Sequence, residues 1–203
     1  MKIALYYSPG ACSLAPHIAL AEAGLPADIV RVDLKSHTLP DGTDYHAVNP
    51  KGYVPVLELD DGTKFTEVAV LLQIIADRKP GALAPEVATM ERYRLNEWLN
   101  FIATEIHKGY NALWHPELGE AAVAAATATL KKRYAVIETQ LGKGPYLTGE
   151  AFTIADAYLF TVTNWSGFLK LDLSGFPNLQ AFMKRVAARP GVVAAMKAER
   201  LIK

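Results

Sequence analysis

The pattern of apolar residues changes near residue 80, and this change constrains the fold of the 203-residue chain more than any other feature. Before it, short β-branched and aromatic runs alternate with turn signals. After it, alanine-, leucine- and charge-rich stretches run at helical spacing. Two prolines and a glycine within 79–85 indicate a linker. We therefore expect two domains, at 1–80 and 87–203, joined by residues 81–86.

The first part has the order β-α-β, loop, β-β-α. Apolar runs of strand length lie at 2–7, 29–32, 54–59 and 63–65, and helical spacing lies at 13–23 and 67–78. A helical crossover makes the first two strands parallel, and the turn Asp60-Asp61-Gly62 makes the last two an antiparallel hairpin. Gly24 predicts the end of the first helix. The inward face of the second is expected at Val70, Leu71, Ile74 and Ile75.

The second part is helical throughout. A long amphipathic helix starts at Met90, with apolar side chains at Tyr93, Trp98, Phe101, Ile102 and Ile106. Further helices are expected at 120–141, 153–169, 177–188 and 192–199, and the second of these ranges starts with the capping-box pattern Thr153…Asp156. Five helices with short connections predict a bundle.

Composition excludes several classes of protein. Lys and Arg number 21, as do Asp and Glu, and a net charge of zero argues against a nucleic-acid partner. No apolar stretch approaches the length of a membrane-spanning helix, and the N-terminus does not resemble a signal peptide. The five histidines lack metal-ligand spacing, so we expect no metal site. A single cysteine excludes an internal disulfide and fits the reducing cytosol, so we expect a cytoplasmic protein.

That cysteine, Cys12, lies where the first strand gives way to the first helix, after the break Pro9-Gly10. The N–H groups and positive end of a helix stabilise an anion there, which favours a reactive thiolate. The alternative is a buried cysteine acting as a small hydrophobic residue. Ala15 occupies the fourth position of a Cys-x-x-Cys motif, so thiol chemistry at Cys12 needs an external thiol.

Two further places suit a ligand: one an extended peptide, the other an amino-acid head group. A proline after Val54 at a strand start leaves Val54 backbone groups available to an extended peptide, although an ordinary edge proline gives the same pattern. At 65–68, N–H groups that open a helix can hold a carboxylate, and Glu67 can hold an ammonium group. Alternatively, Glu67 only complements the helix dipole.

The long helix carries a polar cluster. Asn100, Thr104 and either His107 or Lys108 share one face by the three/four rule. His107 is the residue best suited to proton handling near neutral pH. A solvated helix face is the alternative explanation.

Together these motifs resemble bacterial glutathione transferases of the beta class over nearly the whole chain. The resemblance is carried by 7–13, 49–55, 66–67, 97–108 and 153–160. It implies an α/β thioredoxin-like N-terminal domain followed by an all-α helical bundle domain. It also implies a cytosolic homodimer that binds glutathione, as a co-substrate rather than a cofactor, between these domains.

The resemblance further implies roles for individual residues. Cys12 faces the glutathione sulfur, Val54 pairs its backbone with the cysteinyl unit, and Pro55 is a cis proline. Glu67 and the Val68 N–H hold the γ-glutamyl group. The long helix supplies glutathione-binding residues, some from the partner subunit: Asn100, Thr104, Glu105, Ile106, His107 and Lys108. We expect the catalytic roles to fall on Cys12 and His107.

Two positions depart from the family pattern. His37 stands where the class usually has a lysine that contacts glutathione, and Lys35 lies two residues earlier, so either can be the anchor. Position 68 is valine where many members of the superfamily have serine. One hydrogen bond to a charged group, worth roughly 1.5–3 kcal/mol, is then lost.

The expected function is conjugation of glutathione to hydrophobic electrophiles, with possible thiol–disulfide exchange through Cys12. The alternative is a binding protein that sequesters hydrophobic ligands with little or no turnover. Trp114, Trp165 and Phe168 are candidates for an apolar pocket, although bundle core explains Trp165 and Phe168 equally well. Tyr7 is a further candidate for this pocket, and it matches a tyrosine near the site on which this class does not rely for thiol activation.

Overall fold

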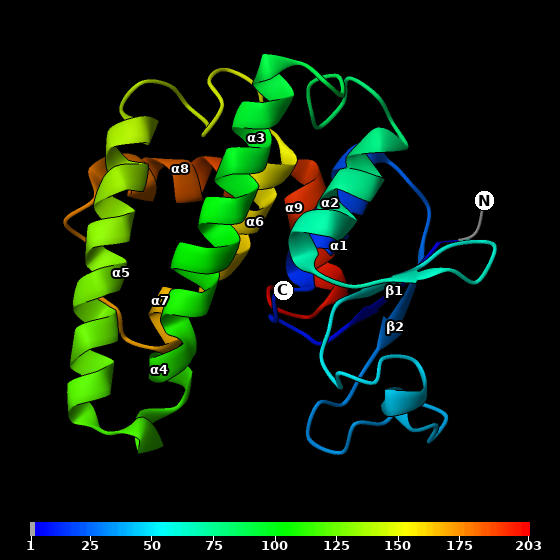
Figure 1. The fold of residues 1–203 in the computed structure, drawn as a ribbon. Helices are drawn as coiled ribbons and strands as arrows, with labels where there is room; N and C mark the ends of the chain where they lie inside the picture. Colours follow the sequence, from blue (N-terminus) through cyan, green and yellow to red (C-terminus); the bar gives the residue numbers. More distant parts are fainter. Residues whose placement is uncertain (1–2) are drawn as a thin grey trace. The chain divides into compact units, whose positions relative to one another are not determined.

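The structure is a computed structural model that describes residues 3–203, and it divides into two compact units (Figure 1). The sheet unit comprises the chain up to Leu83 together with Ala188–Lys203, and the helical unit comprises Ala84–Ala187. The division after Leu83 falls within the expected linker. The last segment, Ala188–Lys203, belongs to the sheet unit. The domain boundaries at 1–80 and 87–203 stay a prediction.

The sheet unit is built on four strands in the order β2-β1-β3-β4. β1 pairs in parallel with β2 and antiparallel with β3, which pairs antiparallel with β4, so the predicted pairing directions are confirmed. The buried Leu5 on β1 lies opposite Ile29 and Leu57. The strand bounds are β1 Ala4–Tyr7, β2 Asp28–Arg31, β3 Val56–Glu58 and β4 Lys64–Phe65. Lys2, in the first expected strand, lies outside the described residues.

Three helices belong to the sheet unit: α1 (Leu14–Ala23), α2 (Val68–Asp77) and α9 (Pro190–Ala198). Figure 1 shows α1 beside both of the others, and it contacts both. Gly24 ends α1 in the left-handed conformation, as expected. Val70 does not point inward, since it is 41% exposed. The buried face of α2 instead follows helical spacing through Val68, Leu71, Leu72, Ile75 and Ala76.

The polar stretch after β2 leads into a short 3-10 helix, η1 (Tyr45–Ala47). The fully buried Tyr45 packs against Tyr6 and belongs to a small apolar cluster with Val32, Val54 and Val56. Its hydroxyl donates to the carbonyl of Tyr53 at 3.2 Å. This packing fixes the segment that precedes β3, which holds the expected Val54–Pro55 motif.

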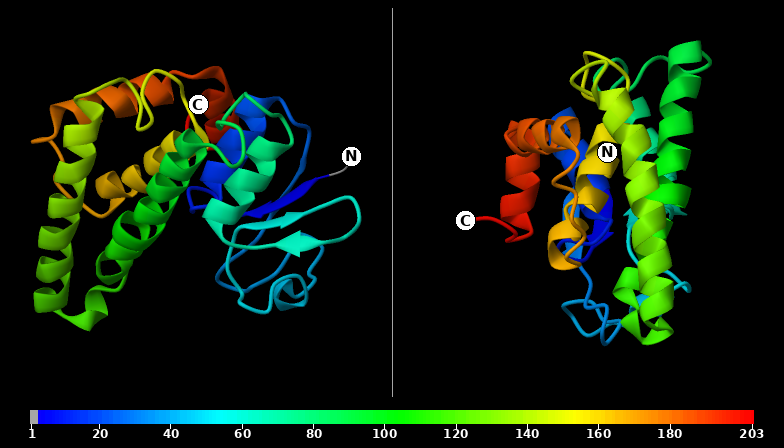
Figure 2. Two further views of the ribbon diagram at one scale, coloured as in Figure 1. Left: turned by 45° about the horizontal axis from the view of Figure 1, so that its top comes forward. Right: turned by 90° about the vertical axis from the view of Figure 1, so that its left-hand side faces the viewer.

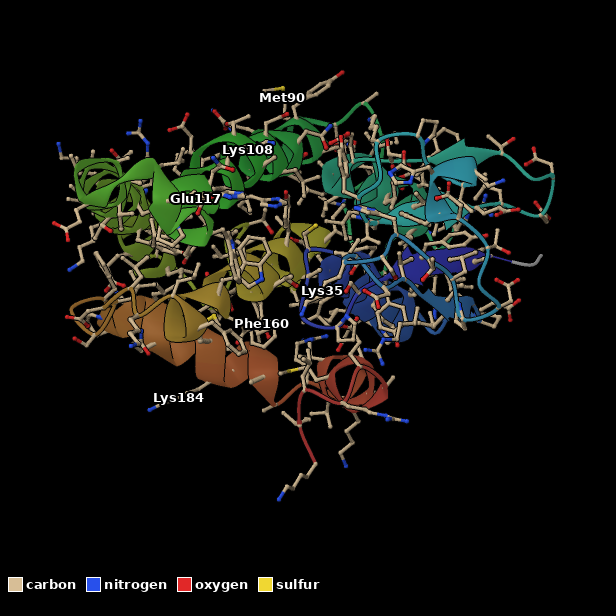
Figure 3. All side chains as sticks on the ribbon, turned by 90° about the horizontal axis from the view of Figure 1, so that it is seen from below. Lys35, Met90, Lys108, Glu117, Phe160 and Lys184 are labelled. Carbon is tan, nitrogen blue, oxygen red and sulfur yellow. The ribbon has the colours of Figure 1, made fainter. Side chains whose placement is uncertain are left out.

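The helical unit surrounds α6, which is buried at every position and contacts α3, η2 and α8. Figure 2 (right) shows α6 in yellow between α3 in green and α8 in orange, and Figure 3 shows its residue Phe160 inside the unit. Among residues 3–203, no helix is both long and apolar enough to span a membrane. The elements are α3 Met90–Phe101, η2 Ile102–His107, η3 Lys108–Tyr110, α4 Asn111–Trp114, η4 Pro116–Leu118, α5 Glu120–Leu141, α6 Ile154–Thr163, α7 Trp165–Phe168 and α8 Pro177–Ala187.

Two helices differ from expectation. The long helix is α-helical only to Phe101, and a π-helical segment, η2, follows. Tyr93 is 56% exposed, because the buried face runs instead through Arg92, Leu95, Leu99, Ile102 and Ile106. The helix expected at 153–169 breaks at Asn164. The Phe160 carbonyl there accepts both the backbone N–H of Asn164, at 3.1 Å, and its side-chain amide, at 2.8 Å.

The predicted capping box at the start of α6 is present. Asp156 Oδ2 accepts hydrogen bonds from the backbone N–H and the hydroxyl of Thr153, at 2.8 and 2.9 Å. Asp156 Oδ1 accepts another from the Leu147 N–H at 2.9 Å. The buried carboxylate therefore joins the start of the central helix to the loop before it.

A second buried carboxylate, on Glu199, fastens α9 to the segment that carries Cys12. Glu199 Oε1 lies 2.9 Å from His17 Nδ1 on α1, and Oε2 accepts the Gly10 N–H at 2.9 Å. At the other end of α9, Glu22 accepts hydrogen bonds from Arg189 and from the Gly191 N–H. The C-terminal helix is therefore tied to α1 at both of its ends.

We predict that Glu199→Ala lowers the free energy of unfolding by about 3 kcal/mol, because it leaves buried polar groups without their acceptor. Glu117→Ala is the matched control, since Glu117 also pairs with a histidine Nδ1, at 2.8 Å, but on the surface. The control is expected to change the unfolding free energy by less than about 0.5 kcal/mol. Urea unfolding curves measure both, and equal losses would contradict the prediction.

Candidate active site

Cys12 lies in the turn between β1 and α1, two residues before the first helical residue, Leu14. Its side chain is half-buried, and Sγ lies 3.4 Å from the carbonyl oxygen of Val54. The N–H groups of Leu14 and Ala15 donate to the carbonyls of Ala11 and Cys12. Those two N–H groups are therefore used within the backbone, and the thiol lies near the end of α1 where the helix dipole is positive.

The Val54–Pro55 peptide bond is cis, as the resemblance implies. The carbonyl of Tyr53 accepts from the Asn49 amide at 2.7 Å, which holds the strand entrance in place. Within residues 3–203, no hydrogen bond uses the Val54 N–H, whereas its carbonyl faces Cys12 Sγ. The backbone at Val54 thus lies beside the only thiol of the chain.

Glu67 occupies the position before α2 with φ 69° and ψ 116°, a left-handed conformation that is unusual outside glycine. Such strain costs about 1–3 kcal/mol and concentrates at functional sites. The exposed Glu67 carboxylate pairs with Lys51 Nζ at 2.8 Å, and Lys51 also donates to the Thr66 hydroxyl at 3.0 Å. The hydrogen bond with Glu67 raises the pKa of the Lys51 ammonium group. Val68 is the first residue of α2 and its side chain is buried.

Of the two candidate anchors in the polar loop, His37 is held against the segment before Val54. His37 has φ 52°, and its Nδ1 lies 2.9 Å from the Gly52 carbonyl oxygen. Its ring centroid is 4.6 Å from that of His46, which contacts Asp44 Oδ1 through Nδ1 at 2.9 Å. The backbone N–H and ring of His46 lower the pKa of the Asp44 carboxyl. Lys35 is exposed in the same loop (Figure 3).

Tyr7 is buried in the sheet unit, and its ring packs against His17 at 5.9 Å between centroids. Its side chain therefore belongs to the packing of β1 on α1.

In the helical unit, the polar residues of the long helix separate into two groups. Asn100, Thr104 and Lys108 are exposed, and the Thr104 hydroxyl donates to the Asn100 carbonyl at 3.0 Å. His107 is half-buried, so Lys108 rather than His107 shares the exposed side. A π-helix has more residues per turn than the α-helix assumed by the three/four rule, and η2 ends at His107.

The buried group of this segment is built around His107. Its Nδ1 lies 2.6 Å from the Tyr158 hydroxyl, and its ring meets that of Trp165 edge-on at 5.0 Å. Glu105 forms an ion pair with Arg133 of α5. The Ile106 side chain is fully buried, so any ligand contact at Ile106 falls to its backbone.

The three candidate pocket aromatics differ in exposure. Trp165 is 6% exposed and meets Trp114 edge-on at 5.8 Å, whereas Trp114 itself is 47% exposed. Phe168 is 73% exposed. Trp165 is therefore a core residue that borders His107, and Trp114 extends the aromatic cluster to the surface.

Within the described part of the chain, no group of three or more histidine, cysteine or acidic side chains could hold a metal ion.

Comparison with known proteins identifies the family. Residues 10–78 match the model for the glutathione S-transferase N-terminal domain, and 101–190 match that for the C-terminal domain. The chain is 48% identical over 199 residues to the glutathione S-transferase GstA of Escherichia coli O157:H7, covering 97% of this chain and 98% of the relative. The chain belongs to the glutathione S-transferase family.

Two solved structures refine this result. A bacterial beta-class glutathione S-transferase from Sphingomonas chungbukensis is 44% identical with a TM-score of 0.93, and the match covers all of both chains. A sphingomonad glutathione S-transferase complexed with glutathione is 41% identical, also with a TM-score of 0.93 and full coverage of both chains. The fold and the beta-class resemblance of this transferase are thereby confirmed.

Sequence reasoning missed two residues of this glutathione S-transferase. Lys51 was within a recognised motif, but its ion pair with Glu67 depends on how two separated segments meet. Tyr158 is 2% exposed in an otherwise buried helix, and a buried tyrosine usually requires a hydrogen-bond partner. That requirement was a usable signal for Tyr158, although it could not name His107.

We predict that Gly52→Ala disturbs the two loop histidines of this transferase. Gly52 has φ 74°, and a Cβ there would lie 2.8 Å from His46 Nε2 and 3.3 Å from His37. Gly62→Ala is the control, because Gly62 has φ 81° and nothing within 4 Å of the added carbon. Both substitutions are expected to cost about 1 kcal/mol of unfolding free energy for the positive φ. Histidine side-chain NMR signals should shift only in Gly52→Ala, and unchanged signals in both variants would refute the contact.

Proposed function

We propose that this transferase uses glutathione as co-substrate and joins its sulfur to hydrophobic electrophiles. The observation that carries the proposal is the 3.4 Å approach of Cys12 Sγ to the Val54 carbonyl oxygen, beside the cis Pro55. A peptide that pairs in extended form with the Val54 backbone brings its own cysteinyl group close to that thiol. Glutathione is a short peptide with a central cysteinyl unit, which suits this arrangement.

The charged ends of glutathione suit the groups around Glu67. The N–H groups at the start of α2, from Val68 onward, lie at the positive end of the helix dipole and can bind a carboxylate. The Glu67 carboxylate can bind an ammonium group. Lys51 is already paired with Glu67 and adds a positive charge for a carboxylate ligand. His37, held by the Gly52 carbonyl, is the proposed anchor in the polar loop, ahead of the exposed Lys35.

The helical unit is proposed to complete the glutathione site, in the same or a second copy of the chain. The exposed Asn100, Thr104 and Lys108 offer polar groups to a ligand. Glu105 and the Ile106 backbone are kept as weaker candidates, because the Glu105 side chain pairs with Arg133. His107 and Cys12 are proposed as the catalytic residues.

The proposed reaction is a nucleophilic displacement. The glutathione thiol loses its proton, the thiolate attacks an electrophilic carbon, a carbon–sulfur bond forms, and a leaving group such as halide departs with the electrons of its bond. Stabilising the thiolate populates the nucleophile at neutral pH. Trp114 is the proposed apolar contact of the electrophile, with Trp165, Phe168 and Tyr7 as weaker candidates. The non-catalytic binding protein is not favoured by the comparisons.

A second reaction is proposed for Cys12 itself. Its thiolate attacks one sulfur of oxidised glutathione, a mixed disulfide forms, and one glutathione thiolate leaves. The chain holds no second cysteine, so only an external thiol can release the adduct. A reducing compartment supplies that thiol, and we propose the cytoplasm as the location.

We predict that oxidised glutathione raises the intact mass of the wild-type chain by one glutathionyl group and leaves Cys12→Ala unchanged. Cys12→Ser is the closer steric match and should also stay unmodified. Both variants are expected to retain part of the conjugating activity, because glutathione brings its own sulfur. A wild-type chain that stays unmodified at mildly alkaline pH would show that Cys12 is not reactive.

The balance between the two reactions is measured by turnover. We expect an aryl halide to be conjugated faster than a small mixed disulfide is reduced at the same glutathione concentration. An apolar pocket suits aromatic electrophiles, and no resolving cysteine is present. A ratio that strongly favours the disulfide would instead make this protein a monothiol reductase on a transferase fold.

We also propose a homodimer. Exposed apolar side chains lie on α2, at Val70, and around the start of α3, at Val87, Met90 and Tyr93 (Figure 3 shows Met90 pointing outward). Val70 falls outside the buried face of α2, and Met90 and Tyr93 fall outside that of α3; exposed apolar surface of this kind is typical of a protein interface.

Sedimentation at micromolar concentration is predicted to give twice the 22.1 kDa chain mass. Tyr93→Glu should shift the protein toward the monomer by placing a charge in the interface. Val136→Glu on α5, a comparably exposed apolar position, should not. A wild-type species of one chain mass would contradict the proposal.

A further inference from the structure

His37 and His46 lie ring to ring in the polar loop of the sheet unit, and the proposed reaction leaves His46 without a role. Their ring centroids are 4.6 Å apart, with the ring planes at 42°. His37 is half-buried and His46 is exposed, so a small ligand can reach the pair from solvent. Histidine is the commonest metal ligand among side chains, which makes this pair a candidate metal site.

In both rings, Nδ1 is already used as a donor. His37 Nδ1 lies 2.9 Å from the Gly52 carbonyl oxygen, which can only accept, so Nδ1 carries the hydrogen. His46 Nδ1 lies 2.9 Å from Asp44 Oδ1. The backbone N–H and ring of His46 hold the pKa of the Asp44 carboxyl below its usual range, so this carboxylate also accepts. Each neutral ring therefore has its lone pair on Nε2.

Neither lone pair is used within residues 3–203. The hydrogen bonds of both rings run through Nδ1, and no described group forms one with either Nε2. Metal-binding histidines almost always donate their second ring N–H to a carbonyl or a carboxylate, which fixes the ring and raises the basicity of the binding nitrogen. His37 has the carbonyl and His46 has the carboxylate, so both rings have this support.

Both rings lie beside Gly52, which has no side chain. A Cβ at this position would lie 2.8 Å from His46 Nε2 and 3.3 Å from His37 Cε1. Cε1 is the ring atom bonded to Nε2, so the unused edges of both rings are near this point. Glycine therefore leaves space next to His46 Nε2 that any other residue would fill.

The separation of the rings matches two neighbouring ligand positions on one ion. With each Nε2 about 2.0–2.1 Å from a metal, two imidazoles at a right angle have ring centres about 4.5 Å apart, and at a tetrahedral angle about 5.2 Å apart. The observed 4.6 Å agrees with the right angle. Square-planar and tetragonal sites with nitrogen and oxygen ligands are typical of Ni²⁺ and Cu²⁺.

The charge and the backbone of the loop also favour a cation site. From Asp33 to His46 the loop holds three aspartates and one lysine, so its charge is negative when both histidines are neutral. His37 has φ 52°, a left-handed conformation that concentrates at functional sites outside glycine. Its carbonyl accepts the Tyr45 N–H at 2.7 Å, which fastens it to the buried η1 tyrosine.

We propose that His37 and His46 bind one divalent transition-metal ion, Ni²⁺ or Cu²⁺, through their Nε2 atoms. Water fills the remaining positions, because the described chain offers no third histidine, cysteine or acidic ligand there. Mg²⁺ and Ca²⁺ prefer oxygen ligands and are excluded. The site needs neither glutathione nor turnover, so it goes beyond the proposed function. A bound ion would also supply the positive charge that neutral His37 lacks as an anchor for a carboxylate.

Calorimetric titration of the untagged chain with Ni²⁺ at pH 7.5, in a buffer that does not bind metals, tests the site. We expect one Ni²⁺ per chain and no binding of Mg²⁺. His37→Gln and His46→Gln should each weaken Ni²⁺ binding about 100-fold, because the second imidazole binds within the same molecule. The control is His115→Gln, which should leave the affinity unchanged. His115 Nδ1 also pairs with a carboxylate, on Glu117 at 2.8 Å, but no second histidine ring meets it within residues 3–203.

Three further variants separate the histidine pair from other causes. Asp44→Asn should weaken Ni²⁺ binding about tenfold, because it loosens the His46 ring. Gly52→Ala should weaken binding by filling the space next to His46 Nε2, whereas its control Gly62→Ala should not. Cys12→Ser should bind Ni²⁺ as the wild type does, since the thiol is not a ligand in this proposal.

A readout on the wild-type protein needs no variant to fold. Ni²⁺ is paramagnetic, so a substoichiometric amount should broaden the NMR signals of two histidine rings at once. Broadening of a single ring or of none overturns the proposal. Ni²⁺ binding that survives both His37→Gln and His46→Gln, or that is lost in Cys12→Ser or His115→Gln, assigns the ion to another group and also overturns it.

Discussion

The sheet unit depends on the buried carboxylate of Glu199. A buried carboxyl group is tolerated only where hydrogen bonds replace those it would make with water, and Glu199 has both the Gly10 N–H and the His17 ring as partners. These two contacts hold the turn after β1 and the helix that follows it. Cys12 lies between them in the chain, so the position of its thiol beside Val54 is set by a residue almost at the other end of the sequence.

Local patterns predicted most of the fold. The pairing directions within the β-α-β and hairpin units, the helix at 120–141 and the stop at Gly24 all follow from apolar spacing and turn residues. The capping box at Thr153 was likewise predicted from the local sequence. Cys12, Val54 and Glu67 were recognised because each lies at a strand or helix start, where backbone groups are exposed to a ligand.

The remaining features depend on contacts between distant segments. The π-helical η2 shifts the register of the long helix, and a rule for α-helices could not separate His107 from Lys108. Val70 and Tyr93 are exposed because the buried face of each helix is set by the elements that pack against it in the folded protein. The pairing of Lys51 with Glu67 and of Tyr158 with His107 also depends on the tertiary structure. Each pair joins residues far apart in the sequence, and no periodic pattern of residues predicts such a contact.

The discontinuous make-up of the sheet unit also affects how the protein is synthesised. Its first segment and α9 are separated in the chain by the whole helical unit. Domains generally fold in order as they leave the ribosome, but this unit lacks its buried acceptor until Glu199 has emerged. The helical unit can complete its core first, and the Cys12 turn receives its anchor only once Glu199 has been synthesised. A nascent or truncated chain therefore does not present the finished thiol site.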